Sequence, residues 1–438
     1  MKILFIENRD KTYFFDAIAK KLLNEHSISW IVQNNQFKPK HGDIFKIKYP
    51  KKTDLKTSNN KNILDISKTD RIINHFSGNN LHYDYYFKEI SKRIRSIKPD
   101  IVFGESTQFH ELISIKICKK YNIPYLNPSS TSYPKNRFFF YMYDKKNPFK
   151  INNSINNINF AEVIDSINNR TMIPDYMSLN NKNTLLDNAT YRLSQILEYF
   201  HGEKYTTPSL FEKISIDLKL KRYLRKWDKL SMPINMLPKN KKIMLYPLQM
   251  QPEANIDVWG NNFRDQSRLI NDISNKLPNN WILVVKTNPK SKYEMNENLF
   301  KSLNNSNVFA INRDIPMHKI LKKVGVITTV TGTIAIEGFL GNIYTFCLAP
   351  SIIDKFPGSS RVRNLKELKI LLKLYEDNKL SYAKQSDKVE FMKFVFKNSF
   401  LGNISDPRSD KNCLNEKNID NLYIAFSKII SRIKHEEI

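Results

Sequence analysis

The chain has 438 residues, 41% of them hydrophobic and 12% aromatic, which is typical of a globular protein and long enough for two domains of roughly 200 residues each. It contains no apolar run of the roughly 18 to 20 residues needed to cross a bilayer, and its first residues lack the features of a signal peptide, so we expect a cytoplasmic protein. Seventy Lys and Arg against 43 Asp and Glu give a net charge of +27. The absence of helix-turn-helix, zinc-finger, RNP and KH patterns argues against nucleic acid, so the charge indicates an anionic membrane surface or a polyanionic substrate, or else reflects a composition biased toward Lys and Asn.

The first part of the chain alternates strand-like and helical segments. Apolar runs of strand length lie at residues 2–7, 27–33, 98–105 and 123–129. Helical stretches between them lie at 14–25, 82–97 and 110–122. This alternation predicts a mostly parallel sheet with helices on both faces, as in a Rossmann-like domain.

Residues from about 140 to 230 break this rhythm with Asn-rich loops and helices such as 183–202. They predict a helical insertion on the acceptor side of the first domain. The aromatic run at 137–143 is interpreted as a buried strand, with stacking on a sugar or a lipid as the alternative. The segment SMPINMLPKNKK, residues 231–242, has two prolines and no periodicity, so it is the best candidate for an interdomain linker.

After this linker the alternation of strands and helices restarts. The stretch from about residue 381 is helical and basic, and we expect it to pack back across the first domain. The predicted domains are therefore 1–235, 236–385 for nucleotide-sugar binding, and a helical end at 386–438. Two Rossmann-like domains joined by a short linker and facing a cleft form the GT-B architecture, which is the expected α/β fold.

Polar residues directly follow three apolar strands of the second half. The strands run into PLQMQPEA (247–254), KTNPKS (286–291) and TGTIAIEG (331–338). Because the carboxyl ends of parallel strands meet at one edge of a sheet, these segments predict a nucleotide site at that edge.

Glu253 is the carboxylate that a sugar-transfer centre needs. The transition state of sugar transfer is oxocarbenium-like and positive, so a carboxylate serves as nucleophile or as base for the acceptor hydroxyl. The alternative is that Glu253 caps the helix expected near Asn262. Gln249 and Gln251 are expected either to position substrate hydroxyls or to satisfy the backbone of the turn.

The next two strand ends carry residues suited to phosphate and ribose. Lys286 follows four apolar residues, so its ammonium is expected to neutralise a leaving CMP or nucleoside diphosphate, or to be a surface lysine. Thr331, Gly332 and Thr333 precede a helix and predict an anion site, with a plain N-cap turn as the alternative. Glu337 shares a helix face with Thr333 and is expected to bind ribose hydroxyls, as such carboxylates do in GT-B enzymes, or to be an exposed charge.

In the first half, Glu105 closes the strand at 98–105 and His110 opens the next helix. The strand-end position makes Glu105 a candidate acid or base across the cleft, with His110 as second choice. A lone histidine at a helix start is also commonly structural. These two residues complete the predicted catalytic set with Glu253.

Several motifs are missing. The chain has no Asp-x-Asp, GxGxxG, GxxxxGK[ST] or GxSxG segment, which argues against metal-chelating glycosyltransferases, dinucleotide oxidoreductases, P-loop NTPases and α/β-hydrolases. The three cysteines are widely spaced, so neither a disulfide framework nor a zinc cluster is supported. We expect no metal and no cofactor besides the donor substrate.

The second half resembles bacterial capsule polysaccharide synthesis proteins, the group that includes retaining Kdo transferases that use CMP-Kdo (Kdo is 3-deoxy-manno-octulosonic acid). That family carries a PLQ segment with an acidic residue four positions after the Gln, matched here by Pro247, Leu248, Gln249 and Glu253. Its Lys-x-His-Pro element appears here as Lys286, Thr287, Asn288 and Pro289. The first half offers a weaker likeness in DIVFGESTQFHE and IPYLNPS.

This resemblance implies that Glu253 is the nucleophile of a retaining enzyme and that Asn288 and Pro289 contribute to nucleotide-sugar binding. Asn288 in place of His is a departure from the family pattern. A neutral amide donates a hydrogen bond but holds no charge, so donor preference or affinity is expected to differ.

We therefore expect a transferase of capsule or lipopolysaccharide synthesis that moves Kdo or a related ulosonic acid from its CMP donor to a glycan or glycolipid. The alternatives are a UDP- or GDP-sugar or CDP-polyol-phosphate transferase, and a non-catalytic scaffold in a capsule-assembly complex. A peripheral position at the inner face of the inner membrane would suit a lipid-linked acceptor. Residues 219–227 and 426–438 are the basic segments expected at an anionic membrane surface, or else are solvated helix faces.

Overall fold

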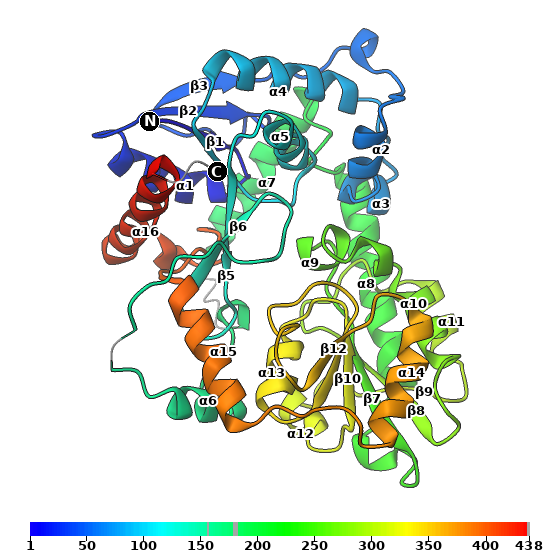
Figure 1. Cartoon of the computed structure of the whole chain (residues 1–438). Helices are drawn as coiled ribbons and strands as arrows, with labels where there is room; N and C mark the ends of the chain where they lie inside the picture. Colours follow the sequence, from blue (N-terminus) through cyan, green and yellow to red (C-terminus); the bar gives the residue numbers. More distant parts are fainter. Residues whose placement is uncertain (156, 178–182, 436–438) are drawn as a thin grey trace. The chain divides into compact units, whose positions relative to one another are not determined.

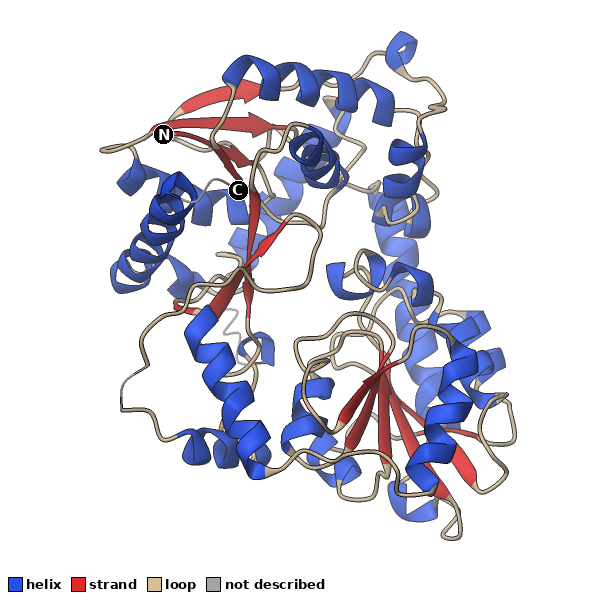
Figure 2. Ribbon diagram, viewed as in Figure 1, coloured by secondary structure: helices blue, strands red, loops and turns tan. Residues whose placement is uncertain are grey.

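The computed structural model describes residues 1–155, 157–177 and 183–435 (Figure 1). Contacts between residues divide the chain into two compact units. Unit 1 consists of Met1–Ser154, Ile173–Glu212 and Phe396–Ile438, and unit 2 consists of Ile155–Met172 and Lys213–Val395. Each unit holds one sheet flanked by helices, as Figure 2 shows. The predicted α/β architecture of two Rossmann-like domains is confirmed.

Unit 1 is built on a seven-stranded sheet in the order β13-β6-β5-β4-β1-β2-β3. Its strands are β1 (Lys2–Ile6), β2 (Ser27–Val32), β3 (Asp43–Lys46), β4 (Ile101–Phe103), β5 (Tyr125–Ser130), β6 (Arg137–Met142) and β13 (Phe400–Leu401). The strands from β3 to β5 are parallel, whereas β6 is antiparallel to both β5 and β13. The aromatic run at 137–143 forms the buried strand β6, as predicted.

Helices cover both faces of this sheet. They are α1 (Lys11–Leu22), η1 (Lys52–Asp54), α2 (Lys61–Ser67), α3 (Arg71–His75), α4 (Tyr83–Ile97), α5 (Phe109–Lys120), η2 (Asp175–Met177), α7 (Leu185–Phe200), η5 (Lys411–Leu414) and α16 (Glu416–His435). Local sequence sets several of their starts, because Asp70 accepts from the backbone of Ile72 and Thr184 accepts from Asp187.

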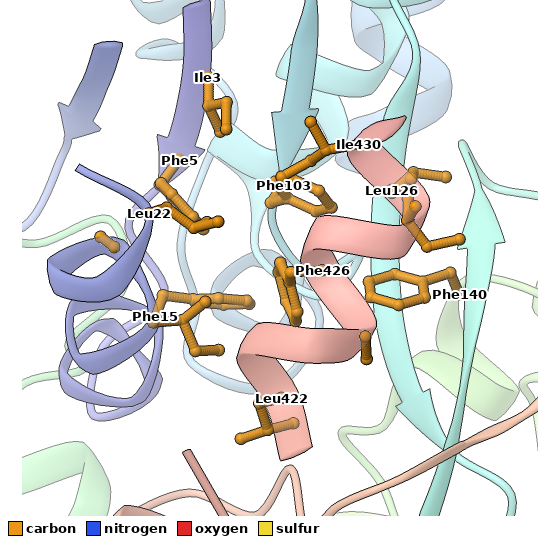
Figure 3. Close-up of a cluster of buried hydrophobic side chains, with 14 of the residues drawn as sticks. Ile3, Phe5, Phe15, Leu22, Phe103, Leu126, Phe140, Leu422, Phe426 and Ile430 are labelled. Atoms are coloured by element: carbon orange, nitrogen blue, oxygen red, sulfur yellow. The ribbon is translucent and has the colours of Figure 1, made fainter. Parts of the chain in front are cut away.

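The C-terminal helix α16 packs against unit 1, as predicted. Figure 3 shows Leu422, Phe426 and Ile430 of α16 facing Phe103 and Phe140 of the sheet. Phe426 lies 4.7 Å from Phe103 and 5.0 Å from Phe140 between ring centroids. One face of the sheet is therefore covered by a segment that arrives from the end of the sequence.

Unit 2 is built on a six-stranded parallel sheet in the order β12-β11-β10-β7-β8-β9. Its strands are β7 (Lys242–Pro247), β8 (Trp281–Lys286), β9 (Val308–Ala310), β10 (Val326–Thr329), β11 (Tyr344–Cys347) and β12 (Ser359–Arg361). β8 is buried along its whole length, which explains its unbroken apolar run.

The helices of unit 2 lie between and around these strands. They are α6 (Phe160–Asn168), η3 (Ile234–Met236), α9 (Ala254–Asp257), η4 (Asn261–Phe263), α10 (Gln266–Ser274), α11 (Glu297–Ser302), α12 (Met317–Leu321), α13 (Ile334–Leu340) and α14 (Leu365–Glu376). Two helices cross a unit boundary: α8 (Leu210–Leu230) begins in unit 1, and α15 (Gln385–Asn398) ends there. Within the described residues, no helix combines the length and the apolarity that a membrane crossing demands.

The unit boundaries differ from the predicted domain limits of 235 and 385. Most of α8 belongs to unit 2, where Trp227 is fully buried in the core. The segment 231–242 also lies within unit 2 and is not a linker between units, since Met232 donates to the Ala310 carbonyl at 3.0 Å and Leu237 is buried. The sequence of an amphipathic helix indicates that one of its faces is buried, but it does not indicate which domain core that face packs against.

Candidate functional site

The predicted nucleotide site lies where the sheet of unit 2 reverses its winding. From β7 the chain passes to β8 on one side and later to β10 on the other, so the reversal falls between β7 and β10. Ligands of open parallel sheets bind beside such a reversal, at the carboxyl ends of the strands. The loops that follow β7 and β10 meet there, because the Thr331 hydroxyl donates to the Asn255 carbonyl at 2.9 Å.

Gln249 ties the two loops together from a buried position. The side-chain amide of Gln249 forms its full set of hydrogen bonds when its oxygen faces the loop after β10. In this orientation the oxygen accepts from Val330 N at 3.0 Å and from Thr331 N at 2.9 Å. Its backbone N–H donates to Gln266 at 2.8 Å. Gln249 therefore holds the loop backbone, which was one of its two predicted roles.

Gln251 is the second buried glutamine of this loop. It donates to Asp257 at 2.8 Å and accepts from Gln266 at 3.2 Å. Asp257 also accepts from the backbone N–H of Glu253 at 3.0 Å and from Arg264 at 3.2 Å. Sequence reasoning missed Gln266 and Asp257, because neither follows a strand directly and only the fold brings them under the loop.

Glu253 is half-buried and directly precedes the short helix α9. One of its carboxylate oxygens accepts from Asn255 at 2.9 Å. The alternative role, capping the helix expected near Asn262, is wrong, because Asp265 caps α10 and the Glu253 side chain caps no helix.

Lys290 is a third residue that sequence reasoning did not single out. Burial and the neighbouring Lys292 lower its pKa, and the carboxylate of Glu253 opposes this shift. Lys290 adds a cation to the loop after β8. The KTNPKS segment contains Lys290, but this lysine follows a turn, and the sequence does not show in which direction the turn leads.

Lys286 lies at the end of β8 but is directed to the protein backbone. Its ammonium donates to the carbonyls of Asn312 at 3.0 Å and Arg313 at 2.5 Å. Burial lowers the pKa of Lys286 to about 8. It is thus neither a surface lysine nor, in this arrangement, a group turned toward a phosphate. Asn288 accepts from the backbone of Lys290 at 2.8 Å, and Pro289 is exposed beside it.

The segment Thr331–Gly332–Thr333 follows β10 as predicted, but part of its backbone is already used. The N–H of Gly332 donates to the Thr329 hydroxyl at 3.2 Å. A Cβ at Gly332 would lie 2.9 Å from that hydroxyl, so a larger residue would force the Thr329 side chain or the loop to shift. Thr333 begins α13 without capping it through its side chain.

Glu337 is buried on α13 and forms an ion pair with Arg170, a residue of the loop after α6. The expectation that Glu337 is an exposed helix charge is therefore wrong. A role in binding ribose would require this pair to share the carboxylate with the ligand.

In unit 1, the corresponding reversal lies between β1 and β4. Glu105 follows β4 and is paired with Lys11 at the start of α1. Burial raises the pKa of Glu105, Lys11 opposes this shift, and the nearby carboxylates of Glu111 and Asp406 reinforce it. A strand-end carboxylate with a raised pKa is suited to acid or base chemistry.

His110 is fully buried, and its Nε2 donates to the Glu7 carbonyl at 2.7 Å. A ring without solvent access has no route to a substrate. The structure therefore supports the structural role of His110 and not the catalytic one.

Comparison with known proteins identifies the family. The model of the capsule polysaccharide biosynthesis protein family matches residues 143–386. The chain belongs to this family. The match contains β7, β8 and β10 with the loops that follow them. No curated protein matches the chain.

Several solved structures resemble this chain remotely, and each structural match covers most of its length. KpsC of Thermosulfurimonas dismutans, a beta Kdo 2,4 transferase, is 11% identical with a TM-score of 0.35, and the match covers 75% of this chain and 87% of that one. The UDP-GlcNAc 2-epimerase of Methanocaldococcus jannaschii is 12% identical with a TM-score of 0.28, covering 90% and 99%. A glycosyltransferase of Rickettsia africae is 10% identical with a TM-score of 0.32, covering 100% and 99%. No assignment of residues rests on likenesses this remote.

Proposed function

We propose that this protein is a glycosyltransferase of bacterial surface polysaccharide synthesis, which transfers Kdo or a related ulosonic acid from its CMP donor to a glycan or glycolipid, with retention. The observation that carries the proposal is the position of Glu253. It stands on the loop after β7, at the reversal of the sheet, in a family whose name refers to capsule polysaccharide.

Glu253 is assigned as the nucleophile. A nucleophilic carboxylate acts in its ionised form. Asn255 donates to one carboxylate oxygen at 2.9 Å, which orients the group for attack on the anomeric carbon. Departure of CMP then leaves a glycosyl ester on Glu253, which the acceptor hydroxyl opens with a second inversion.

The donor is assigned to the loops after β7, β8 and β10. Gln249 and Gln251 hold the first and third of these loops in shape through buried hydrogen bonds, so that Thr331, Gly332 and Thr333 can face the nucleotide. Lys286 fixes the Asn312–Arg313 backbone, and Asn288 with Pro289 shapes the turn that presents Lys290. Glu337 remains the candidate for the ribose.

The acceptor hydroxyl needs a base, and Glu105 is assigned to this role. Its raised pKa gives a carboxylate basic enough to accept a proton, while the pairing with Lys11 keeps it in the ionised form. No metal is required by this scheme, in which Lys290 offsets charge near the leaving phosphate.

The first test measures ligand binding and turnover separately. Thermal unfolding with CMP, CDP, UDP and GDP in parallel should show stabilisation by CMP, by about 2.7 kcal/mol at a hundredfold excess over Kd. The Glu253→Gln variant should keep this stabilisation and lose at least about 10³-fold in turnover with CMP-Kdo. The matched control Glu297→Gln, on the exposed start of α11, should change neither quantity.

Other outcomes lead to other functions. Selective stabilisation by a diphosphate moves the donor to a UDP- or GDP-sugar or a CDP-polyol phosphate. A protein that responds to no nucleotide and turns over no donor is the scaffold of a capsule-assembly complex. Full turnover in Glu253→Gln refutes the assigned nucleophile.

A further inference from the structure

Helix α8 carries an exposed stripe that is apolar along its first half and basic along its second. Phe211, Ile214 and Leu218 are exposed, Phe211 to 87%. They are followed at helical spacing by the exposed Arg222 and Arg225. Positions separated by three, four, four and three residues lie on one face of an α-helix, so these five side chains form a single line, here called the α8 stripe.

The opposite face of α8 is anchored in the protein. Trp227 is fully buried and its indole N–H donates to the Ile311 carbonyl at 3.0 Å. Leu220, Tyr223 and Leu224 pack beside it on the core of unit 2. The orientation of the helix is therefore fixed, and the α8 stripe is held outward instead of being free to turn inward.

Helix α7, which precedes α8, repeats the apolar part of this pattern. Its exposed apolar residues at helical spacing are Leu186, Leu193, Leu197 and Phe200. Its opposite face is held by polar contacts to unit 1, among them the bond from the Tyr191 hydroxyl to Asp10 at 2.8 Å. Large exposed apolar side chains in a row mark surfaces that bind something.

We infer that the α8 stripe docks on an anionic lipid surface. Charge decides between the possible occupants. If the stripes of two copies packed against each other, the basic half of one stripe would meet either the basic half or the apolar half of the other. Neither contact is favourable. A bilayer with anionic headgroups offers both partners at once, because acyl chains receive the apolar half and headgroup phosphates pair with Arg222 and Arg225.

Neighbouring charges support the same occupant. Lys219 and Lys221 are exposed on either side of the stripe, and Glu212 and Asp217 lie on the same flanks, but α8 carries seven Lys and Arg residues against three Asp and Glu residues. Of the two basic segments predicted for a membrane, residues 219–227 thus keep an outward basic face. In residues 426–438, by contrast, Ile429, Ile430 and Ile433 are buried against unit 1, and 436–438 lie outside the described residues.

The contact itself is independent of any activity, and only its purpose, access to a lipid-linked acceptor, rests on the proposed function. The test is flotation of the purified full chain with phosphatidylcholine vesicles, with and without phosphatidylglycerol. Flotation is expected only with the anionic lipid, and raised salt should weaken it. Arg222→Glu/Arg225→Glu should reduce binding more than about 25-fold, at about fivefold for each basic residue removed.

The apolar half is tested with Phe211→Ser/Ile214→Ser/Leu218→Ser, which should also abolish flotation. Two matched controls, Ile370→Ser/Ile424→Ser and Arg95→Glu/Arg268→Glu, change exposed residues on other helices and should float like the original protein. Equal losses in the controls would mean that the diffuse charge of +27 binds the vesicles, and would overturn the inference.

Two further results are decisive. If the protein does not float but forms a dimer that the triple serine variant converts to a monomer, a second copy covers the stripe and the inference is wrong. Stabilisation by CMP, measured on the same variants, should be unchanged. If neither the original protein nor any variant is stabilised by CMP but flotation persists, the proposed donor is refuted and the docking surface is still supported.

Discussion

At the residue scale, the site shows that a lysine at a strand end can serve the backbone instead of a ligand. Lys286 holds the carbonyls of Asn312 and Arg313, and its pKa falls to about 8 because of burial. The unfolded chain keeps the ordinary value near 10.5, so it binds more protons between about pH 8 and 10.5. The contribution of Lys286 to the free energy of unfolding therefore rises with pH across that window.

Carbon-13 NMR of the lysine Cε atoms can measure this pKa directly. One signal should titrate with a midpoint near 8, and it should be missing from the Lys286→Met spectrum. Removing the ammonium should also destabilise unit 2, because two buried carbonyls lose their donor. A Lys286 signal that titrates above pH 10 would show that the ammonium is solvated instead of buried.

Lys11 is predicted to set the pH dependence of catalysis through Glu105. Because Lys11 lowers the pKa of this carboxylate, the Lys11→Met variant should raise it. A base must be deprotonated to act, so the acid limb of kcat/KM should move to higher pH. The control Lys21→Met, which removes an exposed pair with Asp420, should leave the limb in place. An unmoved limb in Lys11→Met would remove Glu105 from the mechanism.

At the scale of elements, each core contains a large aromatic side chain from a helix at one end of its unit. Phe426 of α16 lies in the core of unit 1, and Trp227 of α8 lies in the core of unit 2. Truncating either residue to alanine should cost about 3 to 5 kcal/mol of unfolding free energy in its own unit. Urea unfolding followed by a probe in each unit should locate the loss, and equal losses in both units would contradict independent cores.

The strands and helices were readable from the sequence because hydrophobic periodicity is a local property. The strand ends at Gln249, Lys286 and Thr331 were therefore placed correctly. Local patterns do not predict the partners of the site residues, since Gln266, which binds Gln249, and Arg170, which pairs with Glu337, reach the site only through tertiary packing. For the same reason, the prediction that residues 231–242 form a linker is wrong, since Met232 bonds to Ala310 and Leu237 is buried within unit 2.

At the scale of the whole molecule, two separate cores predict two separate unfolding transitions. Scanning calorimetry should resolve them, with Phe426→Ala lowering one midpoint and Trp227→Ala the other, each by roughly 6 to 20 °C. Under the proposed function, CMP should raise only the transition that Trp227→Ala lowers. A shift of the other transition would place the nucleotide in unit 1.

Unit 1 is built from three separate segments of the chain, and this affects how it folds during synthesis. The strands that carry Phe5, Phe103 and Phe140 leave the ribosome early, but α16, which covers them, comes from the last segment of the chain. At roughly 5 to 20 residues per second, translation of residues 213–395 leaves that face of the sheet open for about 10 to 40 s. Unit 2 is complete before unit 1 can close, so the aromatic half-core of the nascent chain stays exposed while unit 2 folds.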